Sequence, residues 1–200
     1  MTRTFIALEL DESLRHFLGQ VIDRLARQLP AVRWVDPAGI HLTLAFLGEL
    51  SDEQLAAAEQ AAAVAARQSI PFELRLKDLG TFGLPRHPRV IWMGIEESSG
   101  NLVRLHSTLN RELLQRGFEV DTRPFSPHLT LARVKQPLNP TELQTLQRLL
   151  AGKESASSSS RQYIQHLSVM KSELSRSGAK YTCLQASVLG NQSDRSGESN

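Results

Sequence analysis

Cysteine is almost absent from this chain, and so are long apolar runs. The 200 residues include one cysteine, Cys183, which excludes an internal disulfide and leaves no need for an oxidising compartment. We expect its thiol to be a small buried side chain. The first apolar run, residues 5–8, stops at Glu9 and is too short for a signal peptide, and no stretch approaches the length of a membrane span. These absences predict a cytoplasmic protein without a membrane partner.

A strong charge of either sign is also missing. The chain has 23 Lys and Arg against 21 Asp and Glu, a formal net charge of +2, so we expect any contact with nucleic acid to be local. No glycine-rich phosphate loop of the ATPase type occurs, which predicts independence from ATP. With no exposed apolar helix evident, we expect a monomer.

The composition indicates one globular domain. An apolar fraction of 40% over 200 residues is enough for one sizeable core. Residues 190–200 contain no apolar side chain to bury and are predicted to be a disordered tail. We therefore expect a single domain over residues 1–189.

Hydrophobic periodicity predicts strands alternating with helices. We expect strands over residues 4–8, 34–35, 40–47, 72–76, 90–95, 124–134, 163–174 and 180–189. We expect helices near residues 14–29, 51–68, 102–113 and 141–150, with N-terminal caps at Asp11, Ser51 and Thr141, and loops over residues 80–88 and 152–160. This order predicts an α+β protein with two similar lobes, each about half of the chain, facing each other across a cleft.

One five-residue segment occurs twice. His41-Leu42-Thr43-Leu44-Ala45 is repeated letter for letter over residues 128–132, and both copies lie on predicted strands. Since side chains alternate along a strand, the histidine and threonine of each copy share one face and the leucines share the other. If a pseudo-two-fold axis relates the lobes, two imidazoles and two hydroxyls surround one small group, and a phosphate diester is such a group.

Two histidines suit the hydrolysis of a phosphodiester near neutral pH. With ordinary pKa values of about 6.5, one of His41 and His128 can be neutral while the other is protonated, so that one accepts a proton and the other donates one. The hydroxyls of Thr43 and Thr130 can donate to the phosphate oxygens on which charge accumulates. The repeat alone does not say which histidine is the acid.

Two other interpretations of the repeat compete with catalysis. A single strand histidine is more often a partly buried structural residue than a catalyst, and a purely structural duplication would also leave a repeat. A metal site requires three or four ligands, whereas the two segments supply only two imidazoles. The match of five residues on two strands favours catalysis, and we expect neither a metal ion nor a cofactor.

These segments resemble the paired His-x-Thr-x motifs of the two-histidine phosphoesterase superfamily. Within it, the chain is similar to the RNA 2′,3′-cyclic phosphodiesterases, historically called 2′-5′ RNA ligases. Flanking matches extend the resemblance to about residue 189, and they are residues 5–7, Trp34, residues 46–48, residues 88–90 with Trp92, residues 123–125 and residues 172–174.

The resemblance implies a bilobal fold of mainly antiparallel sheet with outer helices and an active cleft between the lobes. It implies hydrolysis of a terminal RNA 2′,3′-cyclic phosphate, or of a small cyclic nucleotide, to a 2′-phosphomonoester, with ligation as a secondary reverse activity. His41 would be the proton donor, His128 the proton acceptor, and Thr43 and Thr130 would hold the phosphate. A non-catalytic module that binds nucleotides or RNA ends is the alternative.

Arg133 follows the second segment, where the family often has arginine, and is a further candidate for the phosphate. Strict alternation from His128 points it to the opposite face, so a bulge would be needed. Arg89, Arg123 and Lys171 are possible RNA contacts, although solvated surface charge is the more common role. For Phe5 and His106, we expect packing rather than base stacking or catalysis.

Overall fold

The computed structural model describes residues 1–152, 160–175 and 178–190. The predicted loop over residues 152–160 and the predicted disordered tail fall almost wholly outside this range. The chain forms, in order, β1 (Thr2–Glu9), α1 (Glu12–Gln28), β2 (Arg33–Trp34), the short 3-10 helix η1 (Pro37–Gly39), β3 (His41–Leu50), α2 (Asp52–Arg67), β4 (Phe72–Leu84), β5 (His87–Glu96), α3 (Asn101–Gln115), β6 (His128–Arg133), α4 (Pro140–Ala151), β7 (Arg161–Ile164), β8 (His166–Ser175) and β9 (Gly178–Val188).

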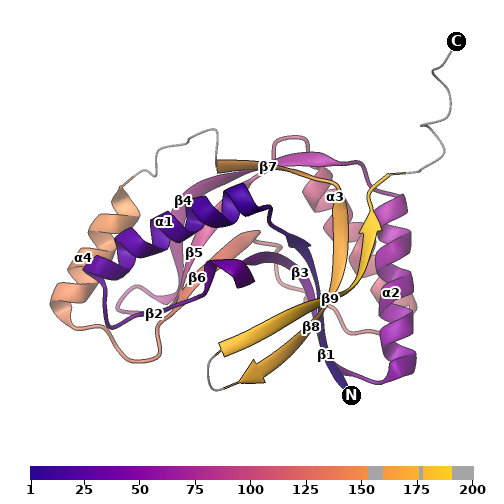
Figure 1. Cartoon of the computed structure of the whole chain (residues 1–200), viewed down its shortest axis with the longest axis horizontal. Helices are drawn as coiled ribbons and strands as arrows, with labels where there is room; N and C mark the ends of the chain where they lie inside the picture. The colour runs from indigo at the N-terminus through magenta and orange to yellow at the C-terminus, as the bar shows by residue number, and fades with distance from the viewer. Residues whose placement is uncertain (153–159, 176–177, 191–200) are drawn as a thin grey trace, which may run out of the picture.

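The strands form two antiparallel sheets, as expected for this α+β architecture (Figure 1). One, which we call the terminal sheet, has the order β3-β1-β8-β9, and the other, the central sheet, has the order β2-β6-β5-β4-β7. The terminal sheet therefore takes strands from both ends of the chain. The prediction that each lobe is one half of the sequence is wrong, because the chain passes to the central sheet for β2 and again for β4 to β7, and returns to the terminal sheet for β3 and then for β8 and β9.

Several predicted boundaries are also wrong. Residues 80–88 are not an open loop, because β4 and β5 continue through them as a hairpin. The predicted strand over residues 163–174 is divided between the two sheets at Gln165. β3 continues past Gly48 to Leu50, and β6 begins only at His128.

The helix caps are confirmed in two of three places. The Asp11 side chain accepts from the Leu14 N–H, and Ser51 forms a reciprocal capping box with Gln54. At α4, however, Asn139 is the cap, because Pro140 at the first helical position leaves Asn139 as the residue that precedes the helix.

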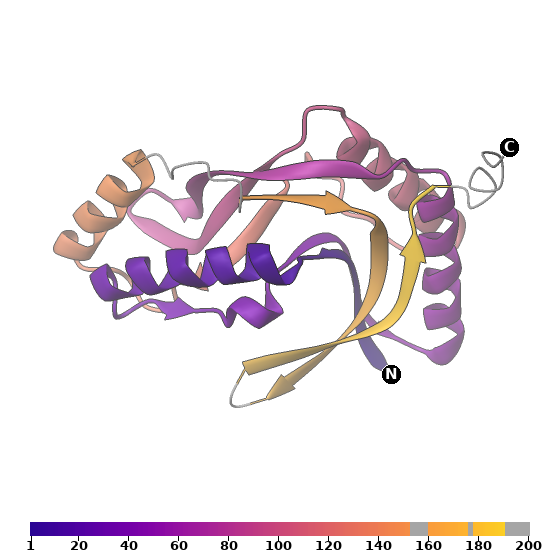
Figure 2. The same ribbon diagram turned by 45° about the horizontal axis from the view of Figure 1, so that its top comes forward.

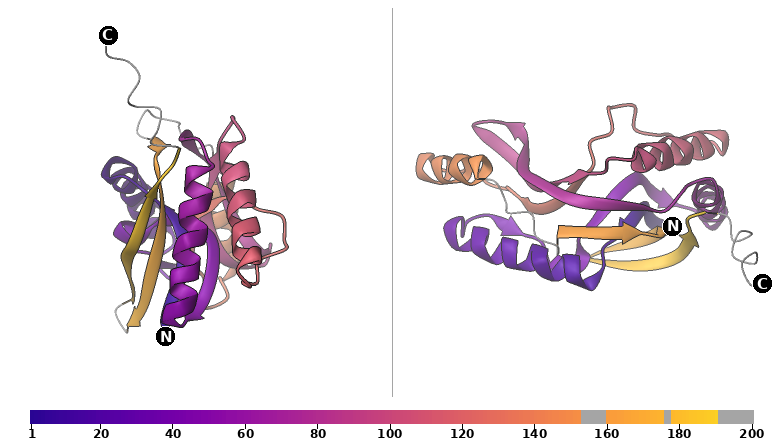
Figure 3. Two further views of the ribbon diagram at one scale, coloured as in Figure 1. Left: turned by 90° about the vertical axis from the view of Figure 1, so that its right-hand side faces the viewer. Right: turned by 90° about the horizontal axis from the view of Figure 1, so that it is seen from above.

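β1 is buried on both faces, and its two faces belong to different apolar clusters. Ile6 and Leu8 join the main core with the apolar faces of the helices, whereas Phe5 and Ala7 pack on the other side with Met170. α2 and α3 lie side by side on the outside at one end of the molecule (Figures 2 and 3). Within the described ranges, no helix combines the length and apolarity needed to cross a membrane.

Candidate active site

The two copies of the repeated segment form β3 and β6, which lie in contact with each other where the two sheets meet (Figure 1). β3 is an edge strand of the terminal sheet, and β6 lies between β2 and β5 in the central sheet. Each histidine is the first residue of its strand. The fold therefore brings together two segments that are 87 residues apart in sequence (128 minus 41).

The pairing register shows which side chains share a face. His41 and Thr43 lie opposite Glu9 and Ala7 of β1, and Leu42 between them is 1% exposed. Because paired and alternate residues point to the same side of a sheet, one imidazole and one hydroxyl project together from the terminal sheet.

The central sheet repeats this arrangement. His128 and Thr130 lie opposite Gly94 and Trp92 of β5, and Leu129 between them is fully buried. We call the sides of the two sheets that carry these histidines and threonines the site faces.

Both motif strands carry a bulge at the fourth residue of the repeat. Leu44 has no partner on β1 and Leu131 has none on β5, because the register shifts there by one residue. A bulged residue changes the alternation of the side chains that follow it. The sixth residues, Phe46 and Arg133, therefore return to the site faces.

The position of Arg133 depends on this bulge. Arg133 lies opposite Val90 of β5, and Thr130 lies opposite Trp92 of the same strand. Val90 and Trp92 are two residues apart, so they share a face. The Arg133 side chain consequently projects from the same face as His128. The strict alternation of the sequence predicted the opposite face.

Both imidazoles are held in the same way by the backbone that precedes them. The Nδ1 of His41 lies 2.8 Å from the Gly39 carbonyl oxygen, and the Nδ1 of His128 lies 2.8 Å from that of Ser126. A carbonyl only accepts hydrogen bonds, so Nδ1 carries the hydrogen in each ring. Nε2 is therefore the ring nitrogen that is available for proton transfer, with a lone pair in the neutral ring and an N–H in the imidazolium.

Aromatic rings fix the orientation of His41. Phe5 stacks on the imidazole with ring centroids 4.6 Å apart, and Tyr181 meets it edge-on at 4.9 Å. Phe5 is 3% exposed, which confirms packing as its role. Burial lowers the pKa of His41 below its ordinary value, and the Gly39 carbonyl and the Glu9 carboxylate act in the opposite direction.

A second aromatic pair supports His128. Phe82 meets its ring edge-on at 4.7 Å, and Trp92 lies 6.2 Å away and 5.3 Å from Phe82. Among protein atoms of the described residues, the buried Nε1–H of Trp92 has no hydrogen-bond partner, so packing holds the indole. A Cβ on Gly80 would lie 2.2 Å from the Trp92 ring, so only glycine allows the indole to lie flat across β4.

The two histidines differ in what lies opposite them. In the strand register, Glu9 lies opposite His41 and Gly94 lies opposite His128. The Glu9 carboxylate accepts a 2.6 Å hydrogen bond from the Ser168 hydroxyl, which holds the negative charge beside the imidazole of His41. Sequence reasoning missed Glu9, because only the strand register places it opposite the first histidine.

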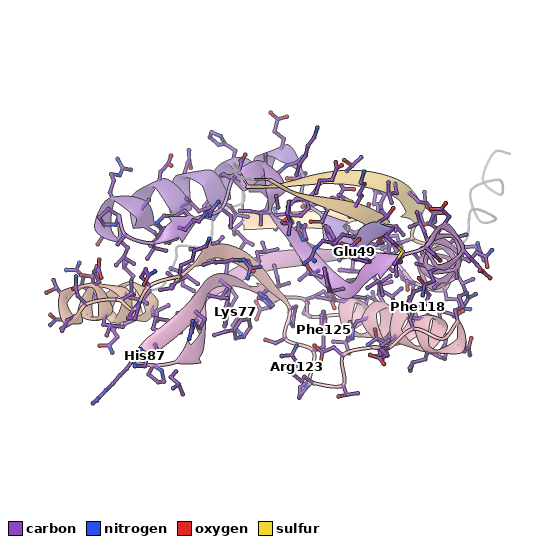
Figure 4. The ribbon with its side chains drawn as sticks, turned by 90° about the horizontal axis from the view of Figure 1, so that it is seen from below. Glu49, Lys77, His87, Phe118, Arg123 and Phe125 are labelled. Carbon is purple, nitrogen blue, oxygen red and sulfur yellow. The ribbon has the colours of Figure 1, made fainter. Side chains whose placement is uncertain are left out.

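The remaining candidates are spread over the surface or packed. His106 stacks on Phe125 with centroids 3.9 Å apart, which confirms packing and ties the segment before β6 to α3. Arg123 on this segment (Figure 4) is exposed and forms an ion pair with Asp121, and Lys171 forms one with Glu173. Arg89 is exposed. Cys183 is exposed too, contrary to the expected buried position.

Metal-ligating side chains do not gather in the part of the chain that the structure describes. No group of three or more His, Cys, Asp or Glu side chains there is arranged to hold an ion. The candidate site therefore consists of the two histidines, the two threonines and Arg133, with the aromatic rings and Glu9 around them.

Known proteins share this architecture and much of this sequence. An RNA 2′,3′-cyclic phosphodiesterase of Methanothermobacter thermautotrophicus is 33% identical over 180 residues, which are 90% of this chain and 95% of that protein. The crystal structure of TT0787 of Thermus thermophilus matches with a TM-score of 0.79 and 27% identity, over 95% of this chain and 99% of that one. E. coli LigT complexed with 3′-AMP matches with a TM-score of 0.73 and 28% identity, over the same shares. The family model described as the 2′-5′ RNA ligase superfamily matches residues 18–176, and the chain therefore belongs to that superfamily of two-histidine phosphoesterases.

Proposed function

We propose that this protein hydrolyses the 2′,3′-cyclic phosphate at the end of an RNA to a 2′-phosphomonoester. The observation that carries the proposal is the pair of His-x-Thr segments on two contacting strands, with both imidazoles held through Nδ1. The name of the archaeal relative, which aligns over most of both chains, supports the same substrate. The 3′-AMP bound by a protein of the same fold is consistent with a nucleotide at this site.

The mechanism requires one proton acceptor and one proton donor. The Nε2 of His128 accepts a proton from water as the water oxygen attacks phosphorus, and the Nε2–H of His41 protonates the 3′ oxygen as its bond to phosphorus breaks. The phosphate remains on the 2′ oxygen. The next turnover requires His128 to lose a proton and His41 to gain one, and solvent can supply both exchanges.

The residues opposite the histidines support this assignment of roles. A carboxylate next to an imidazole favours its protonated form, and Glu9 lies opposite His41, whereas Gly94 lies opposite His128. The structure thus has a carboxylate beside the proposed acid and none directly across from the proposed base. Burial is the larger effect and holds the pKa of His41 below its ordinary value in the protein alone, whereas a phosphate anion in the site acts in the same direction as Glu9 and raises it.

We propose that three side chains hold the phosphate. The hydroxyls of Thr43 and Thr130 project beside the histidines, and Arg133 projects from the same face as Thr130 because of the bulge at Leu131. Hydroxyl and guanidinium donors stabilise the charge that develops on the non-bridging oxygens. We propose that these groups replace a metal ion in the reaction.

Ligation follows from the same groups acting in the same direction on a different nucleophile. If a 5′-hydroxyl takes the place of water, His128 deprotonates it, and the cyclic phosphate is opened to form a phosphodiester. At ordinary RNA concentrations water is the more abundant nucleophile, so we propose hydrolysis as the main reaction.

We further propose that residues 1–189 act as one unit, since each sheet contributes half of the site.

The test is to incubate the purified protein, in EDTA, with an RNA oligomer that ends in a 2′,3′-cyclic phosphate. Enzymatic mapping of the product end should show a 2′-phosphate. A 3′-phosphate would contradict the proposed leaving group, and a requirement for added Zn²⁺ or Mg²⁺ would contradict the metal-free mechanism. Binding of the oligomer without product would instead identify a non-catalytic module for RNA ends.

A further inference from the structure

Two arginines lie directly opposite each other beside the proposed site. Arg33 of β2 pairs with Arg133 of β6, and both side chains are exposed. Because directly paired residues share a face, Arg33 projects from the site face together with Arg133. The next residue, Trp34, points to the other side, where it packs against the core.

Neither guanidinium is neutralised within the part of the chain that the structure describes. Across residues 1–152, 160–175 and 178–190, no carboxylate forms an ion pair with Arg33 or with Arg133. The residue opposite Arg133 on its other side is Val90, which is apolar. Like charges directly opposite each other on neighbouring strands destabilise a sheet, so this pair is an unfavourable arrangement for the protein alone.

An anion between or above the two guanidinium groups removes that repulsion. Arginine offers a planar fork of donors that matches the oxygens of a phosphate. Arg133 lies opposite Val90 and Thr130 lies opposite Trp92, two residues along β5. The backbone of Arg133 is therefore about 7 Å from that of Thr130 along the strand direction. The backbone of Arg33, on the neighbouring strand β2, is about 5 Å farther in the direction across the strands. Arg33 is therefore displaced from the reacting phosphate by a distance that suits a neighbouring phosphate of the same substrate.

We propose that Arg33 binds a second phosphate of the substrate, the one on the 5′ oxygen of the terminal nucleotide, while Arg133 lies between this phosphate and the reacting one. This inference rests on the proposed function, because it takes the cyclic phosphate to lie between His41 and His128. It makes the preferred substrate an RNA end or a 5′-phosphorylated cyclic nucleotide. A nucleoside 2′,3′-cyclic phosphate with a free 5′-hydroxyl lacks the group that Arg33 binds.

The test compares two substrates that differ only in the 5′ group: adenosine 2′,3′-cyclic phosphate with and without a 5′-phosphate. The unchanged protein should have a KM about tenfold lower for the 5′-phosphorylated compound, as expected for one charge-assisted contact. Arg33→Gln should remove this difference while leaving kcat unchanged for both. Arg67→Gln, at the exposed end of α2, removes the same charge far from the site face and should keep the difference.

Two further measurements separate a binding role from a structural one. Arg33→Gln should leave the melting temperature unchanged or raise it, because it removes a like-charge contact. It should also reduce the dependence of KM on salt for the 5′-phosphorylated substrate, since one phosphate contact is lost. An unchanged ratio of the two KM values in Arg33→Gln would overturn the proposal.

Failure of the proposed function would be visible separately. If the unchanged protein hydrolyses neither compound, the catalytic proposal is wrong, and the subsite is then tested by calorimetry with adenosine 2′,5′-bisphosphate and adenosine 2′-monophosphate. Tighter binding of the bisphosphate that depends on Arg33 would support the second-phosphate site. Equal binding of the two nucleotides would overturn it.

Discussion

At the scale of single residues, the two histidines have similar supports but different electrostatic surroundings. Each Nδ1 donates to the carbonyl oxygen two residues earlier, and each ring contacts two aromatic side chains. Glu9 lies opposite only one of them. The sequence predicted both histidines and both threonines as a set, because the repeated segment contains them in order. It could not predict Glu9, which is separated from His41 by an entire helix.

Replacing Glu9 by Gln should lower the pKa of His41 further below its ordinary value. Burial already lowers this pKa, and the Glu9 carboxylate counteracts burial. Since the proposed acid is the protonated form, kcat/KM should begin to fall at a lower pH in Glu9→Gln than in the unchanged protein. An NMR titration of the His41 ring nitrogens measures the shift directly.

Glu49→Gln is the matched control for this change. Glu49 lies near the far end of β3, opposite Arg3 (Figure 4), and its removal should leave the pKa of His41 where it is. A pKa that stays the same or rises in Glu9→Gln would show that the carboxylate does not act on the proposed acid.

At the scale of elements, bulges and close packing decide what each strand presents. The bulge at Leu131 returns Arg133 to the site face, and the hairpin of β4 and β5 brings Phe82 and Trp92 to His128. Sequence alternation alone predicts neither, because a bulge is invisible in a pattern of apolar and polar residues. The glycines and prolines over residues 80–88 predicted a loop instead of this hairpin, because these residues occur both in loops and at the bulged ends of hairpins.

Gly80→Ala should destabilise the protein and slow the reaction. The new Cβ would lie 2.2 Å from the Trp92 ring, so the indole must move away from its place beside Phe82 and His128. Overpacking of this kind costs about 1–3 kcal/mol, which urea unfolding measures. A steady-state assay should show a lower kcat for the folded variant.

Gly19→Ala makes the same change where there is room. A Cβ on Gly19 meets the Pro37 ring at an ordinary 3.4 Å, and glycine inside a helix is less stable than alanine by about 0.5–1 kcal/mol. This variant should therefore be more stable, not less, and fully active. If Gly80→Ala were as stable and active as Gly19→Ala, packing of Trp92 would not position His128.

At the scale of the whole molecule, the site exists only where the two sheets meet. The terminal sheet combines β1 and β3 with β8 and β9 from the other end of the chain, and the central sheet takes the strands between them. The number and type of most elements could be predicted from hydrophobic periodicity. The division into lobes could not, because pairing between the first and last strands depends on contacts more than a hundred residues apart and leaves no local pattern.

The central claim is that two histidines, one from each sheet, act as acid and base without a metal ion. It is tested most directly by measuring, in EDTA, the rate at which His41→Ala and His128→Ala open an RNA 2′,3′-cyclic phosphate, with Ser107→Ala on the exposed side of α3 as a surface control. Each histidine variant should lose about 10²- to 10⁴-fold in kcat, while the control keeps full activity. Turnover that is unchanged in either histidine variant would contradict the account.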